Sequence, residues 1–394
     1  MILSDIATIF DCPHSTAPDE GEGYPLIRTP NIGRGRLILD GVHRVCKDVY
    51  DLRNKRAIPQ LNDIIFAREA PAGNAAVITE GQFVCLGQRT VLIRPNPSFV
   101  DAHYLVYYLL APKQQIKLLG YSHGATVGHV NIPDIAKLPI ELPELHVQRK
   151  IASIIEHYDN LIEVNNKRIK VLEQMAENLY KEWFVRFRFP GHETAEFENG
   201  IPKGWNVCRF SSIANVLSGG TPSTDHDEYY GGNIPFYTPK DSSDDYFVFD
   251  TISKLTEEGL QHCNSQLYPK NTIMITARGT VGNLNLLAKP MAMNQSCYAL
   301  TSNTIPSQYF LFFLIKREIL KLRKMASGGV FDTIIVSTFD HIKVTIPDES
   351  LIMSFDRLVS PILDETYTLL KQNRNLIRQR DLLLPRLMSG KLEV

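Results

Sequence analysis

Residues 151–183 read IASIIEHYDNLIEVNNKRIKVLEQMAENLYKEW, and apolar side chains recur in this stretch at alternating steps of four and three residues. This heptad spacing predicts one long helix with a seam that packs against another helix. Asn165 is the one clearly polar position of the seam, and we expect it either to be buried and fix the register or to face solvent at a frayed edge. The seam comprises Ile151, Ile155, Tyr158, Ile162, Asn165, Ile169, Leu172, Ala176, Leu179 and Trp183.

A second, less regular seam lies near the end of the chain and contains three polar positions. At about 1.5 Å per residue, each predicted helix of roughly 40 residues is about 60 Å long. The second seam comprises Phe355, Leu358, Ile362, Thr366, Leu369, Asn373, Leu376, Arg380, Leu383 and Leu387.

The two helices belong to two copies of one sequence unit, because short matches recur along the chain in the same order. Ser4–Ala7 recurs as Ser211–Ala214, for example. A near-constant spacing between matches indicates an internal repeat of about 200 residues. The other matches are Pro25–Ile27 with Pro235–Tyr237, Ile64–Arg68 with Met274–Arg278, Gly73–Asn74 with Gly282–Asn283, Gln88 with Gln295, Tyr104–Tyr108 with Tyr309–Phe313, and Gly124 with Gly328.

Residues 1–143 and 190–347 contain short apolar runs between Gly, Pro and Thr, which is typical of mixed α/β domains. We expect one helix in each, at His103–Leu119 and Gln308–Lys324. The predicted fold class is α+β, with two globular α/β domains separated by two long antiparallel coiled-coil helices and related by a pseudo-two-fold axis. The predicted boundaries are 1–143 and 190–347 for the globular domains, and 144–189 and 348–394 for the helical regions.

The composition is that of a globular chain. Its 394 residues carry a formal net charge of −1, and none of the six cysteines forms a C-x-x-C pair. These features favour reduced thiols over a disulfide framework or a zinc ribbon. The N-terminus has no basic, then apolar, signal pattern, and no run is long enough to span a bilayer. We therefore expect a cytoplasmic protein without membrane contact.

Catalytic motifs are missing or out of context. No lysine follows Asp or Glu by two residues, as a common type of metal-dependent nuclease requires, and no P-loop motif occurs. Residues 120–124 fit G-x-S-x-G, but that motif needs a preceding strand, whereas Tyr104–Leu119 is expected to be helical. Asn96–Phe99 resembles a methyltransferase loop but has no Gly-rich cofactor turn before it. We expect no catalytic residue, metal or bound cofactor in this chain.

Each copy of the repeat contains a basic stretch. A solvated surface would explain one such stretch, but one in each copy favours DNA as a ligand. Arginine can bind guanine with a fork, and Asn or Gln can pair with adenine, so matched polar residues are candidates for base readout, although each alone could stabilise a loop. The basic residues are Arg28, Arg34, Arg36, Arg44, Lys47, Arg53, Lys55 and Arg56 in the first copy, and Lys316, Arg317, Lys321, Arg323 and Lys324 in the second.

Several motifs together resemble those of the specificity (S) subunits of type I restriction-modification systems. Ile201–Trp205 leading to Ser218–Ser223 resembles the opening of a target-recognition domain of that family. Ala277–Gly282 with Asn294–Cys297 is similar to the centre of that domain, and residues 124–143 to its exit into the central helix. Arg380–Leu392 resembles the family's C-terminal ending.

The resemblance implies a non-catalytic subunit that reads a bipartite, asymmetric sequence in double-stranded DNA. It also implies two methyltransferase (modification) subunits and restriction (nuclease-translocase) subunits as partners, with S-adenosylmethionine, ATP and Mg²⁺ bound by those partners. A methyltransferase or nuclease with fused recognition domains, or a protein-binding adaptor, remains an alternative. The candidate DNA-binding residues are Arg28, Arg34, Arg36, Arg68, Asn74, Gln88, Arg89, Thr221, Tyr237, Lys240, Arg278, Thr280, Asn283, Asn294 and Gln295.

Overall fold

The structure is a computed structural model that describes residues 1–120, 129–325 and 333–394. It divides into two compact units, residues 1–162 with 375–394 and residues 163–374. Each unit contains one globular domain and part of each long helix. Of the G-x-S-x-G stretch at 120–124, only Gly120 belongs to the described residues. The match of Gly124 with Gly328 lies outside them.

The first unit is built on a five-stranded sheet of order β1-β8-β5-β6-β3 and a three-stranded sheet of order β4-β2-β7. The strands are β1 (Ala7–Asp11), β2 (Tyr24–Ile27), β3 (Gly35–Arg36), β4 (Arg44–Val45), β5 (Ile64–Ala67), β6 (Ala75–Val77), β7 (Cys85–Leu86) and β8 (Thr90–Pro95). The helices are α1 (Leu3–Ile6), η1 (Thr29–Asn31), α2 (Lys47–Arg53), α3 (Ala102–Leu110), α4 (Pro112–Gly120) and α5 (Ile132–Ala136).

The second unit repeats this plan with the orders β12-β19-β16-β17-β14 and β15-β13-β18. Its strands are β9 (Phe197–Glu198), β10 (Ile201–Pro202), β11 (Asn206–Arg209), β12 (Ala214–Ser218), β13 (Tyr230–Tyr237), β14 (Phe247–Val248), β15 (Ser253–Leu255), β16 (Ile273–Thr276), β17 (Leu284–Leu287), β18 (Ala292–Met293), β19 (Cys297–Ser302) and β20 (Lys343–Ile346). Its helices are η2 (His192–Thr194), η3 (Phe210–Ser212), η4 (Asp227–Tyr229), η5 (Pro239–Asp241), α7 (Glu257–Gln261), α8 (Gln308–Met325) and α9 (Val336–His341).

The structure confirms the repeat and corrects two of its matches. The predicted match of Tyr104 with Tyr309 is wrong by one residue, because Asp101 and Ser307 each accept a hydrogen bond from the N–H three residues later, which aligns Tyr104 with Phe310.

The sheet registers correct the other match. Ala67 pairs with Thr90 in the first unit, and Thr276 pairs with Cys297 in the second. The residue that follows each strand donates its backbone N–H to the loop opposite, from Arg68 to the carbonyl of Arg89 and from Ala277 to the carbonyl of Ser296. Arg68 therefore corresponds to Ala277, and the predicted match of Arg68 with Arg278 is wrong by one residue.

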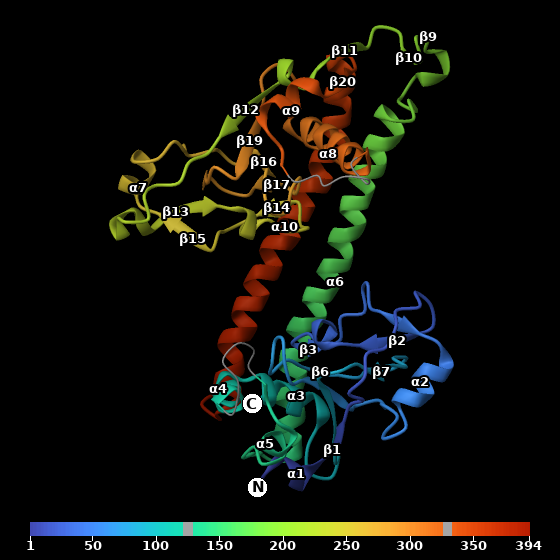
Figure 1. Cartoon of the computed structure of the whole chain (residues 1–394), viewed down its shortest axis with the longest axis vertical. Coiled ribbons are helices and arrows are strands. Elements are labelled where there is room, and N and C mark those ends of the chain that lie inside the picture. The colour runs from blue at the N-terminus through green and yellow to red at the C-terminus, as the bar shows by residue number, and fades with distance from the viewer. Residues whose placement is uncertain (121–128, 326–332) are drawn as a thin grey trace. The chain divides into compact units, whose positions relative to one another are not determined.

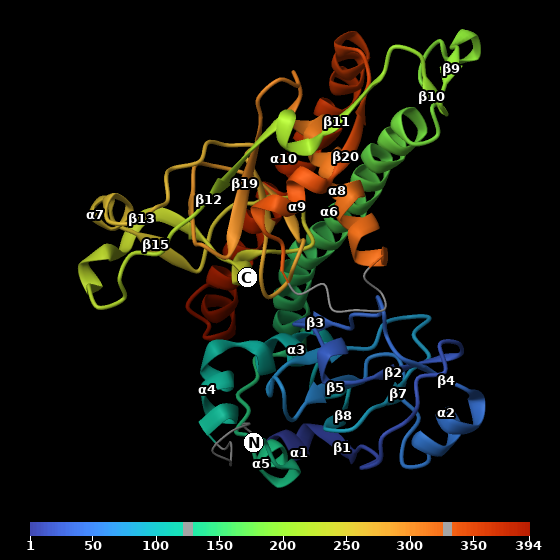
Figure 2. The same ribbon diagram turned by 45° about the horizontal axis from the view of Figure 1, so that its top comes forward.

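In each unit the five-stranded sheet lies between two hydrophobic cores. One face of β5, through Ile64 and Phe66, packs against α3 and the start of the long helix. The other face, through Ile65 and Ala67, packs against the small sheet. The second unit has the same layers, with α8 and the long helices on one side and β13 and β15 on the other (Figures 1 and 2). Because both faces are covered, the loops at the ends of the strands carry much of the accessible polar surface.

The two long helices, α6 (Leu145–Phe184) and α10 (Glu349–Met388), contain 40 residues each. Within the second unit they are antiparallel, because Asn165 bonds to Asn373 whereas Arg168 pairs with Glu365. The predicted second seam is wrong at Leu358. That side chain is half exposed, and its neighbour Val359 is fully buried in its place. No helix in the described parts of the chain is long and apolar enough to cross a bilayer.

The single helix predicted at His103–Leu119 is also incorrect. Ala111 has extended backbone angles, and Pro112 starts the separate helix α4. A residue before proline is disfavoured in the helical region, so the chain breaks there. The other predicted helix, Gln308–Lys324, agrees with α8.

Candidate nucleic-acid interface

In the second unit, a tight loop follows β16 and presents three consecutive exposed residues, Arg278, Gly279 and Thr280. Gly282 closes the loop by donating its backbone N–H to the carbonyl of Thr276 at 2.8 Å. Gly279 and Gly282 both have positive φ angles, which glycine adopts without the steric cost of a side chain. The loop therefore holds Arg278 and Thr280 outward from the end of a buried strand.

Three other loops meet this one. The backbone N–H of Asn294 bonds to the carbonyl of Tyr237 at 3.0 Å, and that of Gly220 bonds to the carbonyl of Met293 at 3.2 Å. A side chain at Gly219 would approach the Asn294 carbonyl to 2.4 Å, so these loops can pack this closely only with glycine there. The ends of β12, β13 and β16 and the turn between β18 and β19 thus form one continuous edge.

This edge displays cations and hydrogen-bonding groups. The Thr221 hydroxyl donates a hydrogen bond to Oε1 of Gln295, and both residues are exposed. Lys240 and Arg278 are exposed, and neither has a hydrogen-bond or ion-pair partner among the described residues. Two unpaired cations beside an amide and hydroxyls are suited to phosphate and base-edge contacts.

The three remaining candidates of the second unit support the edge from behind. Tyr237 is 0% exposed, and its hydroxyl donates to Asn285 at 2.8 Å, so its side chain belongs to the core rather than to the surface. Burial also raises its pKa. Asn283 donates to Ser242 at 2.9 Å and accepts from Arg323 at 3.1 Å. Asn294 caps its own turn by accepting from the N–H of Ser296 at 3.1 Å.

The corresponding edge of the first unit carries a network of ion pairs. Arg68 is 8% exposed and donates to the Val130 carbonyl at 3.0 Å, while a second guanidinium nitrogen lies 2.7 Å from Nε2 of His129. His129 in turn contacts Glu69 at 2.6 Å. Arg89 is exposed and lies 3.0 Å from the same carboxylate. The charges of this edge are therefore largely compensated by one another.

Two other candidates of the first unit donate side-chain hydrogen bonds to backbone carbonyls of neighbouring loops. Gln88 donates to the carbonyl of His14 at 2.6 Å, and Asn74 donates to the carbonyl of Ile32 at 3.0 Å. Arg28 is half-buried, and its Nε has no hydrogen-bond partner among the described residues. These three residues lie at the ends of β7, β6 and β2, on loops close to the Arg68 network in the fold.

Arg34 and Arg36 flank the short edge strand β3 and contact helices. Arg34 donates to the carbonyl of Leu110 at 3.2 Å, and Arg36 donates to the side chain of Asn160 on α6. The structure thus groups the candidates into a loop edge and a helix-facing pair. Nothing in the basic pattern of this stretch distinguished the two groups.

Sequence reasoning missed the acidic and histidine partners of the first edge, namely Asp11, His14, Glu69 and His129. Asp11 lies 2.8 Å from His14 and 3.2 Å from Arg56. Asp11, Cys12 and His14 form the one group, among the described residues, whose ligand atoms are close enough for a metal ion. The Asp11 carboxylate of this group also contacts two arginines, since Arg56 lies 3.2 Å and Arg68 3.6 Å from its oxygens.

Two buried thiols lie near the same edges. Burial raises the pKa of Cys85 to about 11 and that of Cys297 to about 12. Both thiols therefore remain protonated at neutral pH, and neither is an activated nucleophile.

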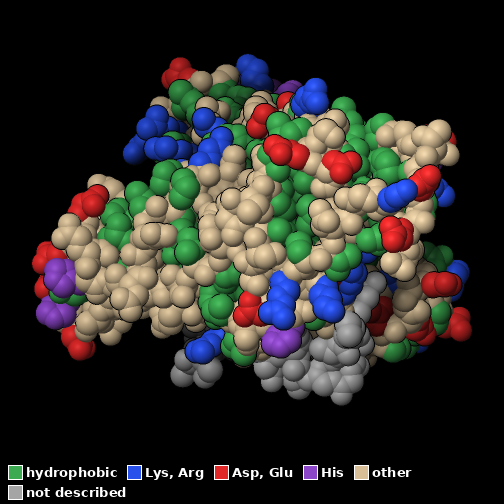
Figure 3. Space-filling model, turned by 90° about the horizontal axis from the view of Figure 1, so that it is seen from above, with side chains coloured by type: hydrophobic (Ala, Val, Ile, Leu, Met, Phe, Trp, Pro, Cys, Tyr) green, Lys and Arg blue, Asp and Glu red, His purple; other side chains and the backbone are tan. Residues whose placement is uncertain are grey.

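On the face shown in Figure 3, Lys and Arg side chains form several small groups among hydrophobic and neutral surface rather than one broad basic face.

The sequence profile described as "Type I restriction modification DNA specificity domain" matches residues 1–174 and again residues 202–376. The chain belongs to this family. The double match coincides with the two copies of the repeated strand order, and it confirms the resemblance seen in the sequence motifs.

Relatives within the type I specificity family span nearly the whole chain. The HindI specificity subunit of Haemophilus influenzae is 24% identical, and the alignment covers 89% of this chain and 91% of the relative. The MjaIX specificity subunit of Methanocaldococcus jannaschii is 26% identical over 84% of this chain and 78% of that one. The crystal structure of a type I S subunit from M. genitalium shares the fold, with a TM-score of 0.59 and 15% identity over 98% of this chain and 95% of that one.

Proposed function

We propose that this chain is the DNA specificity subunit of a type I restriction-modification complex. It reads a bipartite, asymmetric DNA sequence, with one half-site for each globular domain. It also positions two modification subunits and the restriction subunits on that DNA. Family membership supports the class of function, and the repeat with divergent loop edges supports the asymmetry of the site.

The observation that carries the proposal is the loop edge of the second unit. Arg278, Thr280 and Gln295 project from loops that glycines and backbone hydrogen bonds hold in place. A guanidinium can bind guanine O6 and N7 at once through its fork of N–H groups, and an amide can pair with adenine. Lys240, without such a geometry, is suited to a phosphate.

The two edges differ in a way that suits two different half-sites. In the second unit the cations Lys240 and Arg278 are unpaired among the described residues, whereas in the first unit Arg68 and Arg89 are paired with neighbouring side chains. Structural equivalence places Glu69 where the second unit has Arg278. Similar scaffolds with different side chains would select different bases, so the full site would not be a palindrome.

Catalysis in this proposal resides in the partner subunits, which bind S-adenosylmethionine, ATP and Mg²⁺. The lack of a D/E-x-K or P-loop motif in the sequence supports this division of roles. A complex of this kind acts on intracellular DNA, so the cytoplasm is the proposed location. A fused methyltransferase or nuclease is not favoured by the family match.

A methyl-transfer assay tests the proposal. The purified chain, the modification subunit and their mixture are each incubated with labelled methyl donor and genomic DNA. We expect label in DNA only with the mixture, and weaker labelling when Arg278→Ala replaces the native chain. Methylation by the chain alone would support the enzyme alternative, and failure of the chain to bind DNA in any mixture would support the adaptor.

A further inference from the structure

Arg89, on the loop edge of the first unit, extends its side chain into solvent. The side chain is 60% exposed, whereas Arg68 on the same edge is enclosed at 8%. Nε of Arg89 lies 3.0 Å from Oε2 of Glu69. Neither terminal nitrogen of the Arg89 guanidinium donates a hydrogen bond to a residue in the described part of the chain. The side chain is therefore anchored by one ion pair and keeps its terminal N–H groups available to a ligand.

The backbone at Arg89 is held as well. Its φ of 63° lies in the left-handed region, which residues other than glycine seldom adopt. The Arg89 carbonyl accepts the N–H of Arg68 at 2.9 Å, and the Thr90 hydroxyl donates to the Gly87 carbonyl at 3.0 Å across the same turn. Unfavourable backbone conformations persist only where the surroundings hold them, and they cluster at ligand sites.

Glu69 is held through its other carboxylate oxygen. Oε1 of Glu69 lies 2.6 Å from Nδ1 of His129, and Nε2 of His129 lies 2.7 Å from a guanidinium nitrogen of Arg68. Because a guanidinium can only donate, Nε2 of His129 accepts from Arg68, and Nδ1 carries the proton that is donated to Glu69. Each oxygen of Glu69 thus has its own partner, His129 on one side and Arg89 on the other.

The ion pair of Glu69 with Arg89 orients the arginine more than it stabilises the fold. A pair whose side chains are 19% and 60% exposed adds little to the free energy of folding. It does restrict the rotamers of a long side chain. A guanidinium that is oriented before binding loses less conformational entropy when it forms a two-pronged contact.

The second unit carries its exposed arginine on the opposite loop of the same edge. Arg278 stands at the position of Glu69, and Ser296 stands at the position of Arg89, since Ala277 donates its N–H to the Ser296 carbonyl at 2.8 Å. Each edge therefore presents one exposed arginine at this place, after β16 in the second unit and between β7 and β8 in the first. Only the arginine of the first unit has a carboxylate to orient it among the described residues.

We propose that Arg89 reads a guanine in the half-site bound by the first unit and that Glu69 is its positioning residue. This inference rests on the proposed function of the chain as a DNA specificity subunit. The terminal N–H groups of Arg89 match the O6 and N7 acceptors that guanine presents in the major groove. The Glu69 carboxylate beside the guanidinium disfavours a phosphate as the ligand, because its negative charge repels the DNA backbone.

The test begins with sites selected from a randomised DNA library by the native chain assembled with its modification subunits. Competition with single-base variants of the selected site then measures the preference at each base pair. Arg89→Ala should reduce the preference for one G·C pair in one half-site by about tenfold. Arg278→Ala should act only in the other half-site. Unchanged reading of the other half-site shows, in the same assay, that each variant folds and assembles.

Glu69→Gln tests the positioning role. The substitution preserves the size of the side chain but leaves one oxygen for the two donors that Glu69 binds. The preference for the same G·C pair should fall by about threefold. Affinity for random-sequence DNA should not fall, because a negative charge is removed. In the Arg89→Ala background the substitution should have no further effect on base preference, since it acts through Arg89.

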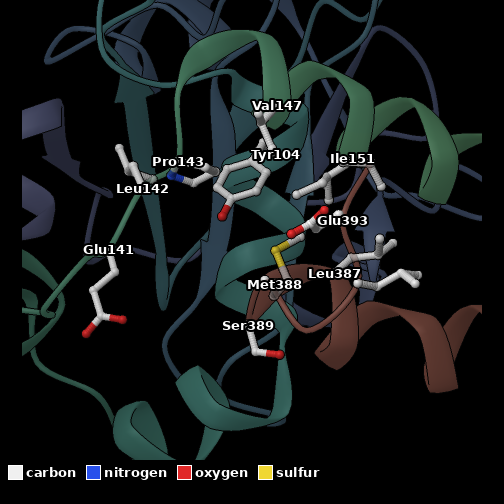
Figure 4. A pocket seen from close by; sticks show the side chains of 13 residues that line it. Tyr104, Glu141, Leu142, Pro143, Val147, Ile151, Leu387, Met388, Ser389 and Glu393 are labelled. Atoms are coloured by element: carbon white, nitrogen blue, oxygen red, sulfur yellow. The ribbon is translucent and has the colours of Figure 1, made fainter.

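Glu141→Gln is the matched control, because it also removes a carboxylate from an ion pair of the first unit, with Lys113 at 3.7 Å. Glu141 lines a pocket of about 470 Å³, and Figure 4 shows its side chain apart from the other labelled residues. It lies next to the N-terminal segment, since Ile140 donates its N–H to the Met1 carbonyl, whereas the loop edge lies at the end of β1. This variant should leave the base preference unchanged.

Two results would overturn the inference while the proposed function stands. One is equal weakening of all sequences by Arg89→Ala, which would indicate a phosphate contact. The other is an additional loss of base preference when Glu69→Gln is combined with Arg89→Ala. A native complex that selects no sequence at all would overturn the proposed function and this inference with it.

Discussion

Nδ2 of Asn165 on α6 donates a 2.9 Å hydrogen bond to Oδ1 of Asn373 on α10, and both side chains are 5% exposed. Asn373 in turn donates to Asn166 at 2.7 Å, and Asn165 to Gln372 at 3.1 Å. The polar position that interrupts the heptad seam is therefore buried and paired. A buried polar pair of this kind favours one register of two helices over the alternatives.

Replacing Asn165 alone by leucine should destabilise the second unit by about 1–3 kcal/mol, because Asn373 loses a buried partner. The double variant Asn165→Leu/Asn373→Leu should recover most of that loss, since two apolar groups replace the bonded pair. Urea unfolding of the single and double variants measures the coupling. Additive losses would show that the two asparagines do not act as a pair.

The second prediction concerns Glu173 on α6. Burial raises the pKa of Glu173 to about 7, even though the backbone N–H of Tyr246 donates to it at 3.2 Å. The folded state therefore holds this proton more tightly than the unfolded state. The resulting stability is complete below the unfolded value near 4.5 and is lost as the pH rises through about 7.

Glu173→Gln should accordingly match the native chain in stability at pH 4 and exceed it by roughly 1–2 kcal/mol at pH 8, after allowance for solvent screening. Urea unfolding at the two pH values is the measurement. Glu177→Gln is the matched control, and its effect on stability should have the opposite sign. Burial acts to raise the pKa of Glu177, but hydrogen bonds from Lys316 and other donors lower that pKa to about 2. That variant should be less stable at pH 8, and equal pH profiles for the two variants would contradict the assignment.

Arg278→Ala should relax the preference for one base pair in one half-site by about 1–3 kcal/mol, if its guanidinium binds guanine with both nitrogens. Binding to random DNA should change little. The matched control is Arg209→Ala, which removes an exposed arginine of the same unit from β11, away from the loop edge. Competition assays with single-base variants of the site provide the measurement. An equal effect of both substitutions would remove Arg278 from base readout.

The sequence carried the repeat, the fold class and the long helices, because heptad spacing and ordered matches survive divergence. The sequence could not show which residue of β5 is equivalent to which residue of β16. Every residue of Ile64–Ala67 and of Ile273–Thr276 is buried, so no alternation of polar and apolar residues marks the faces. The resulting one-residue error matched Arg68 with Arg278, although the Arg68 side chain is buried and the Arg278 side chain is exposed.

The candidate site was predictable only as a list of residue types. Tyr237 and Arg278 are both plausible DNA contacts by chemistry, yet one lies in the core and the other on a loop tip. Burial separates them, and burial follows from the packing of the small sheet. His129, which contacts Arg68, and Glu69, which contacts His129, are 60 residues apart in the chain and meet through tertiary structure alone.

The long helices should set the distance between half-sites. One heptad inserted after Ile162 and one after Arg374 adds about 10 Å to each helix at the boundary between the two units, and leaves the contacts within each unit intact. The preferred spacer should lengthen by about three base pairs at ~3.4 Å each, with both half-sites unchanged. Site selection on the assembled complex measures this. A complex that assembles but retains the native spacer would exclude the helices as the determinant of spacing.

The most direct test of the central claim is selection of bound sequences from a randomised DNA library by the chain assembled with its modification subunits. Two similar domains with different loop edges predict two short, unlike half-sites separated by an unspecified spacer. Helices of about 60 Å span somewhat under two turns of duplex, so the half-sites should lie between one and two turns apart. A single contiguous sequence, or a perfect palindrome, would contradict the account.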